Sequence, residues 1–307
     1  MRNSQKRTDK KQTDWLSRNA VQKNIFVWTF MSIAIVNFAI FYLYVNINSF
    51  VLAFTDVNGK FGLDYFKSVF ELIVQDGGSL GIALKNTSIY FLYGVIVFPL
   101  GLIHAYLFYK KLKWGNFFRL VFHLPLIISA VVMTTTFKYM INPDGPLGVL
   151  YLKIFNADRV PAFLIEEEYA KWTMIFYNFW FGYAGSLLLW GGAMARIPTE
   201  IVESVNMDGI GWSRELRSII IPLIWPTLSI TILTMIAGFF STDVGVLLLS
   251  EGSGNSGNVS YWMFAQIKYY NDYHLASAFG LTLSLIIVPV SLLTRKILGK
   301  IWADVEY

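Results

Sequence analysis

Six long apolar runs, separated by polar segments, constrain this chain more than any other feature. The runs cover residues 25–45, 87–109, 117–140, 172–195, 219–241 and 275–294. Each has about 20 residues or more, which is enough to cross roughly 30 Å of hydrocarbon as an α-helix. Of the 307 residues, 55% are hydrophobic and only 15% are charged, which is too apolar for a soluble domain of this size. The sequence therefore predicts an all-α integral membrane protein with six transmembrane helices.

The distribution of charge predicts the orientation in the membrane. Of the 25 Lys and Arg residues, 17 lie in the two terminal segments and in the connections on the same side, whereas 12 of the 20 acidic residues lie on the opposite side. Because basic residues are enriched in cytoplasmic segments, we expect both termini inside (N-in/C-in). The first run has 21 residues and no small-residue cleavage site after it, so we interpret it as a retained helix and not as a signal peptide. The expected organisation is a basic cytoplasmic tail (1–24), a six-helix domain (25–298) that includes a cytoplasmic loop (196–218), and a second cytoplasmic tail (299–307).

Several kinds of chemistry are excluded. The chain has no cysteine, and its three histidines are far apart in sequence, so neither thiol chemistry nor a histidine-pair metal site is expected. No Gly-x-x-x-x-Gly-Lys-Ser/Thr loop is present to hold nucleotide phosphates, and no Ser/His/Asp arrangement is found. The net charge of +5 follows membrane topology and gives no reason to expect nucleic acid as a partner. We predict a protein that is not an enzyme and that holds no cofactor of its own.

The loop 196–218 has the signals of two short helices. Thr199 is expected to cap the first helix, and Glu200 and Glu203 lie in its first turn, where carboxylates suit the helix dipole. Gly209 supplies a stop, because glycine accepts the left-handed conformation common at helix C-termini. Ser213 is expected to cap the second helix, which runs into the fifth apolar run.

This loop resembles a known motif. Glu203-Ser204-Val205, three residues, Gly209, nine residues, Ile219, one residue and Ile221-Pro222 follow the spacing EAA-x3-G-x9-I-x-LP. That motif is found in the membrane permeases of binding-protein-dependent ABC importers; this chain departs from it at Ser204, Val205 and Ile221. The resemblance implies the type I ABC importer permease fold. It also implies that the first short helix couples to an ATPase, through residues Glu200, Glu203, Ser204, Val205, Asp208, Gly209, Ile219 and Pro222.

Other segments resemble the carbohydrate-uptake (maltose-type) branch of the same family. They include Phe54-Thr55-Asp56, Pro143-Asp144-Gly145 and the glycine- and serine-rich segment 250–258. The resemblance implies a carbohydrate, in particular an oligosaccharide, as the solute. It also implies a second permease subunit, an ATPase dimer that uses ATP and Mg, an extracytoplasmic solute-binding protein, and a bacterial or archaeal cytoplasmic membrane.

A few polar and aromatic residues within the apolar runs are candidates for the solute path. Asn178, Phe239, Phe240, Ser241 and Asp243 combine aromatic faces that suit sugar rings with polar groups at membrane depth. Each also has a simpler interpretation. Asp243 would lie at the membrane interface, Asn178 would make an interhelical hydrogen bond, and the aromatic rings would face lipid.

Three alternative functions stay open on the sequence. One is the same kind of importer for another solute, such as glycerol phosphate, a polyol or an amino acid. The second is an ion-coupled secondary transporter, although such proteins tend to have carboxylates in their spans and inverted repeats, which we do not find here. The third is a membrane scaffold without transport activity.

Overall fold

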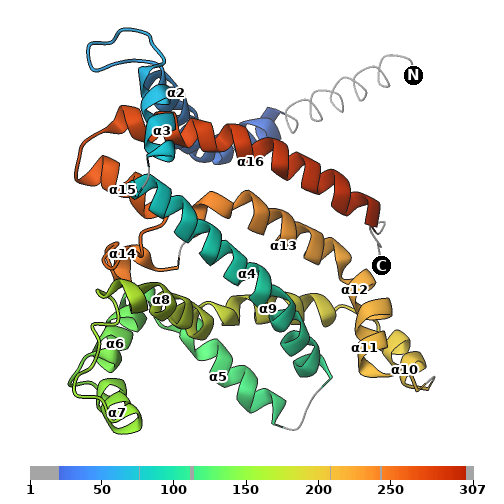
Figure 1. Ribbon diagram of the computed structural model, residues 1–307. Coiled ribbons are helices and arrows are strands. Elements are labelled where there is room, and N and C mark those ends of the chain that lie inside the picture. The colour runs from blue at the N-terminus through green and yellow to red at the C-terminus, as the bar shows by residue number, and fades with distance from the viewer. Residues whose placement is uncertain (1–20, 76, 111–113, 208, 243, 302–307) are drawn as a thin grey trace, which may run out of the picture.

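The computed structural model describes residues 21–75, 77–110, 114–207, 209–242 and 244–301 (Figure 1). Of the predicted site residues, Asp208, Asp243 and the side chain of Val205 lie outside this description, as does most of the N-terminal tail. The described part is helical, and its only strand-like feature is an isolated bridge between Thr55 and Phe61. The elements are η1 (Ala39–Tyr44), α2 (Val45–Ala53), α3 (Asp64–Val74), α4 (Ser79–Tyr109), α5 (Gly115–Ile127), α6 (Ala130–Ile141), α7 (Pro146–Phe155), α8 (Glu167–Phe181), α9 (Tyr183–Met194), α10 (Thr199–Met207), α11 (Trp212–Glu215), η2 (Leu216–Ile220), α12 (Ile221–Leu223), α13 (Trp225–Ala237), η3 (Phe239–Ser241), α14 (Val246–Leu249), α15 (Val259–Lys268) and α16 (Tyr273–Ile301).

Long apolar helices make this a multi-pass membrane protein. Among the described residues, three single helices have the length and hydropathy to cross a membrane: Val21–Ala53, Ser79–Tyr109 and Tyr273–Ile301. Two more candidate spans are helix pairs with a sharp bend, which brings the number to as many as five. The predicted fourth run is divided between α8 and α9, which meet at Gly182. The helical class is confirmed, and the count of six spans and the N-in/C-in orientation stay predictions.

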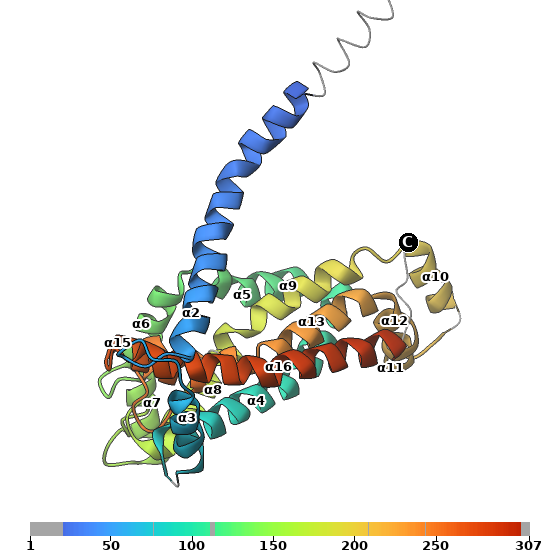
Figure 2. The ribbon, with the colours of Figure 1, turned by 90° about the horizontal axis from the view of Figure 1, so that it is seen from above.

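The N-terminal helix, Val21–Ala53, projects away from the rest of the molecule (Figure 2). None of the residues in its most apolar 18-residue window is buried. Its extensive contact with the bundle is in its last part, where α2 packs against α16. A helix of this length and hydropathy needs either lipid or another protein around it.

Two of the predicted spans are strongly bent. The segments Phe117–Ile127 and Ala130–Phe155 meet at 104°, because Ile128 is extended and the Ser129 hydroxyl caps the next helix by accepting from Val132 N–H. Trp212–Leu223 and Trp225–Ala237 meet at 81°, between Pro222 and Pro226. Proline lacks an N–H and clashes with the preceding turn, so a bend here agrees with the sequence.

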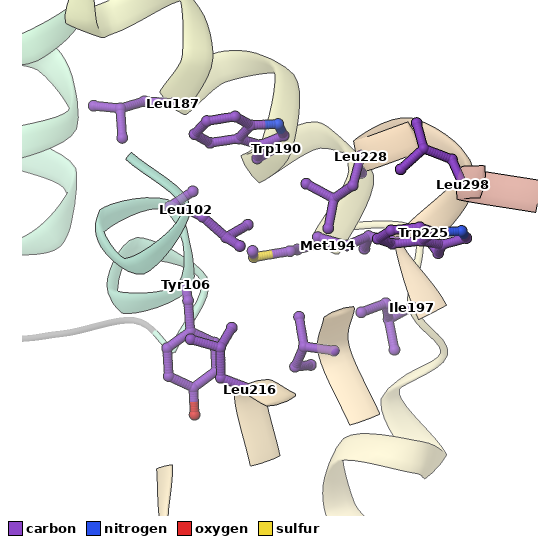
Figure 3. Packing of buried hydrophobic residues seen from close by; sticks show 14 residues of the cluster. Leu102, Tyr106, Leu187, Trp190, Met194, Ile197, Leu216, Trp225, Leu228 and Leu298 are labelled. Carbon is purple, nitrogen blue, oxygen red and sulfur yellow. The ribbon is translucent and has the colours of Figure 1, made fainter. Parts of the chain in front are cut away.

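Three apolar clusters hold the bundle together. The largest joins α4, α9, η2, α13 and the end of α16, and it has Trp190 and Met194 near its centre (Figure 3). Here α4 approaches α9 closely at Gly101, where a methyl group would lie 2.6 Å from Cζ3 of Trp190. A second cluster joins α2, α3, α15 and α16, and a third joins the middle of α4 to α6, α8 and α14. We call the part near α10 and α11 the α10–α11 end, and the part near α14 and α15 the α14–α15 end (Figure 1).

At the α14–α15 end, hydrogen bonds fix the loop 250–258 to the first half of α4. The Asn86 amide donates to the carbonyls of Asn255 (2.6 Å) and Gly257 (2.8 Å), and the Tyr90 hydroxyl donates to the carbonyl of Ser256 (2.8 Å). Both Asn86 and Tyr90 are buried. This loop, which the sequence suggests only as a glycine-rich connection, is therefore a well-packed element.

Candidate functional site

The short helix α10 presents most of the predicted coupling residues to the outside. Its first helical residue is Thr199, one position before the start that the predicted cap at Thr199 implies, and Glu200, Glu203 and Ser204 are all exposed. Met207, at its end, is 87% exposed. On the other side, Ile201 packs against the cluster of Figure 3. Ile201 thus attaches the helix to the bundle, and the described side chains Glu200, Glu203, Ser204 and Met207 leave a mixed polar and apolar face accessible.

The turn after α10 depends on glycine. Gly209 has φ +64°, which confirms the predicted left-handed stop. A methyl group on Gly209 would meet nothing within 4 Å, so the requirement is conformational and not one of space. The expected cap at Ser213 is wrong: Gly211, with extended backbone, precedes the first helical residue, Trp212, and no side chain caps α11.

After the turn the chain returns to the bundle. Leu216 and Ile220 in η2 are buried in the cluster of Figure 3, and Ile219 is half-buried. Pro222 follows in α12, immediately before the 81° bend that leads into α13. The motif residues at both ends of the loop are thus placed differently, those on α10 outside and those after α11 against the bundle.

A buried carboxylate fixes α11, and the sequence analysis did not select it. Glu215 is 3% exposed. Its Oε2 accepts a hydrogen bond from the Tyr106 hydroxyl (2.7 Å), and its Oε1 lies 3.0 Å from Nζ of Lys110. Tyr106 and Lys110 lie one turn apart at the end of α4, more than 100 positions from Glu215. The i, i+4 spacing is visible in sequence, but nothing in a single sequence points from it to Glu215.

The predicted solute-path residues separate into two groups. Phe239, Phe240 and Ser241 form η3, and Phe239 packs edge-on against Phe91 of α4. Asn178 lies on α8, where it is half-buried beside Gly182.

Phe240 and Ser241 line a cavity of about 430 Å³ between η3, α15, α16 and the N-terminal helix. Its polar lining consists of small side chains from several helices, namely Asn46, Ser49, Ser241, Ser260, Ser277 and Ser284. Asn178 is not among the lining residues. In the part of the chain that the structure describes, no group of three or more His, Cys, Asp or Glu side chains is placed to hold a metal ion.

Comparison with solved structures defines the class of fold. The chain is similar to a permease chain in the crystal structure of a bacterial ABC transporter involved in the import of the acidic polysaccharide alginate, with a TM-score of 0.78 and 20% sequence identity over 92% of this chain and 98% of that one. A second crystal structure, of the alginate ABC transporter in complex with its pentasaccharide-bound periplasmic protein, gives the same TM-score at 18% identity. The fold is therefore that of an ABC importer permease.

Relatives found by sequence indicate which kind of ABC importer permease the chain resembles. The chain is 27% identical over 286 residues to MsmF of Streptococcus mutans, the permease protein of a multiple sugar-binding transport system, covering 89% of this chain and 95% of that protein. It is 27% identical over 235 residues to the lactose transport permease LacF of Rhizobium radiobacter (75% and 78% covered). It is 23% identical over 273 residues to the arabinooligosaccharide transport permease AraP of Bacillus subtilis (87% and 86% covered).

No family model matches the chain. The resemblance to sugar-importer permeases is nevertheless confirmed by these relatives, which are transport permease subunits and not enzymes.

Proposed function

We propose that this chain is one permease subunit of an ABC importer that moves a carbohydrate, in particular an oligosaccharide, and forms half of the translocation path. The observation that carries the proposal is α10, an exposed short helix with the importer motif, on a chain that has the importer permease fold. Because the chain has no nucleotide-binding loop of its own, the energy of ATP hydrolysis must reach it from a partner, and the loop is the site of that contact.

The exposed face of α10 is suited to docking into a groove of an ATPase. Glu203 offers a carboxylate and Met207 offers apolar surface (87% exposed), and Trp212 at the start of α11 adds a second exposed apolar side chain (60% exposed). A short helix with this mixture is the usual ligand of helix-in-groove recognition. ATP and Mg bind in the partner ATPase dimer. When that dimer closes, the docked helix transmits the movement to the permease.

The α10–α11 end is the cytoplasmic end in this proposal. It carries the loop 196–218, and the excess of Lys and Arg predicts that this loop and both termini lie inside. The α14–α15 end, with the loop 250–258, then faces outward toward a solute-binding protein. The membrane is a bacterial or archaeal cytoplasmic membrane.

The N-terminal helix supplies a surface for a second permease. A single chain has one coupling loop, whereas an ATPase dimer offers two grooves. The apolar surface of Val21–Ala53, none of which is buried in its most apolar window, gives the second subunit a face on which to pack. The two subunits would enclose the path between them.

The solute is argued from chemistry and relatives together. The cavity beside Phe240 combines an aromatic ring with the amide of Asn46 and several hydroxyls, groups that recognise sugar rings and their hydroxyls. The relatives are named for multiple sugars, lactose and arabinooligosaccharides. We include Phe239, Ser241, Asn178 and Asp243 in the path on the sequence argument given above.

Co-purification tests the proposal. The tagged chain is isolated from its native membrane in mild detergent, and the proteins that accompany it are identified. We expect a nucleotide-binding ATPase and a second permease. The cognate binding protein is then screened by thermal shift, since a bound ligand stabilises the folded state. A stabilisation by oligosaccharides supports the solute class, stabilisation only by a polyol, glycerol phosphate or an amino acid replaces it, and a chain that purifies without an ATPase overturns the proposal.

Two charge changes in the loop test the coupling role. Gly209→Asp and Glu203→Lys are expected to leave the chain in the membrane but to separate ATP hydrolysis from uptake. Arg217→Gln, an exposed change nearby, is the control. Normal uptake in both loop variants would contradict the role of α10.

A further inference from the structure

Glu215 is the only charged side chain that is buried among the residues that the structure describes (3% exposed). A buried carboxylate is strongly unfavourable unless its oxygens are paired. Here both oxygens have partners, Tyr106 in the last turn of α4 and Lys110 immediately after that helix. The side chain therefore joins α11 to α4 by directional bonds at a definite position along the helix.

Directional bonds matter because the other contacts at this end are apolar. Leu216 and Ile220 pack in the cluster of Figure 3, and contacts of this kind keep much of their energy when two elements slide past each other. A two-oxygen contact to Tyr106 and Lys110 loses its geometry with a shift of about 1 Å. The α10–α11 loop and the end of α4 are therefore expected to move together.

The opposite half of α4 is fixed in the same way. Asn86 and Tyr90 bond to three successive carbonyls of the loop 250–258, at Asn255, Ser256 and Gly257. From residue 86 to residue 106, one continuous helix spans about 30 Å at 1.5 Å per residue. The helix thus has polar attachments at both ends, to the coupling loop at one and to the 250–258 loop at the other (Figure 1).

We propose that α4 transmits movement, as one rigid helix, between the coupling loop and the loop 250–258. Glu215 is the positioning residue at one end of α4, and Asn86 is the positioning residue at the other. This rests on the proposed function. In that setting a loaded binding protein displaces the loop 250–258, α4 moves with it, and Glu215 carries the movement to α11 and so to α10. The route is distinct from the covalent one through α9 and α13.

The test uses the whole complex, reconstituted in lipid vesicles, and measures how far the loaded binding protein stimulates ATP hydrolysis. The variants are Glu215→Gln, Asn86→Ala and their combination. Each single variant is expected to reduce the stimulation about tenfold, a common size for coupling between two sites. Because both residues act through the same rigid helix, the double variant is expected to lose no more of the stimulation than a single variant does.

The double variant distinguishes this proposal from two independent local effects on structure, because the losses of stimulation would then combine differently. Changes about 30 Å apart that act independently are expected to multiply, which here gives about a hundredfold loss. A multiplied loss, or singles with wild-type stimulation, overturns the proposal. Tyr106→Phe replaces Glu215→Gln if the latter does not assemble, and Arg217→Gln and Ser88→Ala, both at exposed sites, are the controls. If the wild-type complex shows no stimulation at all, the proposed function fails, which is a different result.

Discussion

Replacing Gly209 by alanine isolates the conformational requirement of the coupling turn. At φ +64° an alanine adopts a left-handed conformation that costs roughly 1–2 kcal/mol for residues with a Cβ. No atom lies within 4 Å of the added methyl group, so no steric term is added to this cost. We expect Gly209→Ala to weaken whatever requires the observed turn by about five- to thirtyfold.

Gly211 is a matched control two residues away. It also has open space around it, but its φ of −65° and ψ of 147° suit alanine without strain. Gly211→Ala is therefore expected to be neutral or slightly favourable.

The assay is the affinity of the purified ATPase for the permease in nanodiscs, measured for wild type and both variants. Gly209→Ala should dissociate more readily, and Gly211→Ala should match wild type. Equal affinities for the two alanine variants would refute the argument that the left-handed turn presents α10 to its partner.

Three further predictions concern packing and pH. Gly101→Ala should lower thermal stability by an overpacking cost of about 1–3 kcal/mol, because the methyl group meets the ring of Trp190, whereas Gly94→Ala, with open space, should not. Gly252→Ala should destabilise more than Gly59→Ala: both have positive φ, but only at Gly252 does the methyl group collide, with the ring of Tyr261. The N–H of Ala162 and then Arg159 hold the pKa of Glu166 below its ordinary value. The stabilisation by Glu166 is therefore complete above the ordinary pKa and is lost as the pH falls through the lowered pKa. Glu166→Gln should remove this pH dependence when thermal stability is measured over an acid titration.

The sequence predicted the helical membrane class, the two short helices of the coupling loop and the turn at Gly209, because these depend on short-range signals, whereas the cap at Ser213 was wrong. Hydropathy marked Ser79–Tyr109 and Tyr273–Ile301, and glycine chemistry marked the turn at Gly209. The sequence did not predict the sharp bend after residue 127, since one serine that caps a new helix leaves the hydropathy of the run almost unchanged.

The remaining features depend on contacts between distant segments. Glu215 meets Tyr106 and Lys110 only after α4 and α11 are packed together, and the same holds for Asn86 and the loop 250–258. The single sequence contains both partners of each pair but no signal that joins them. The solute path is the least constrained part, because Phe, Tyr and Ser are common throughout the chain.

Crosslinking from α10 tests the central claim most directly. The chain has no cysteine, so Met207→Cys introduces one thiol at an exposed position whose residue type the motif does not specify. Tyr270→Cys, 71% exposed near the α14–α15 end, is the matched control. With a short thiol-to-amine crosslinker in native membranes, the account predicts that Met207→Cys joins a nucleotide-binding ATPase and that Tyr270→Cys does not. An ATPase adduct from Tyr270→Cys alone, or none from Met207→Cys in a complex that still transports its solute, would contradict it.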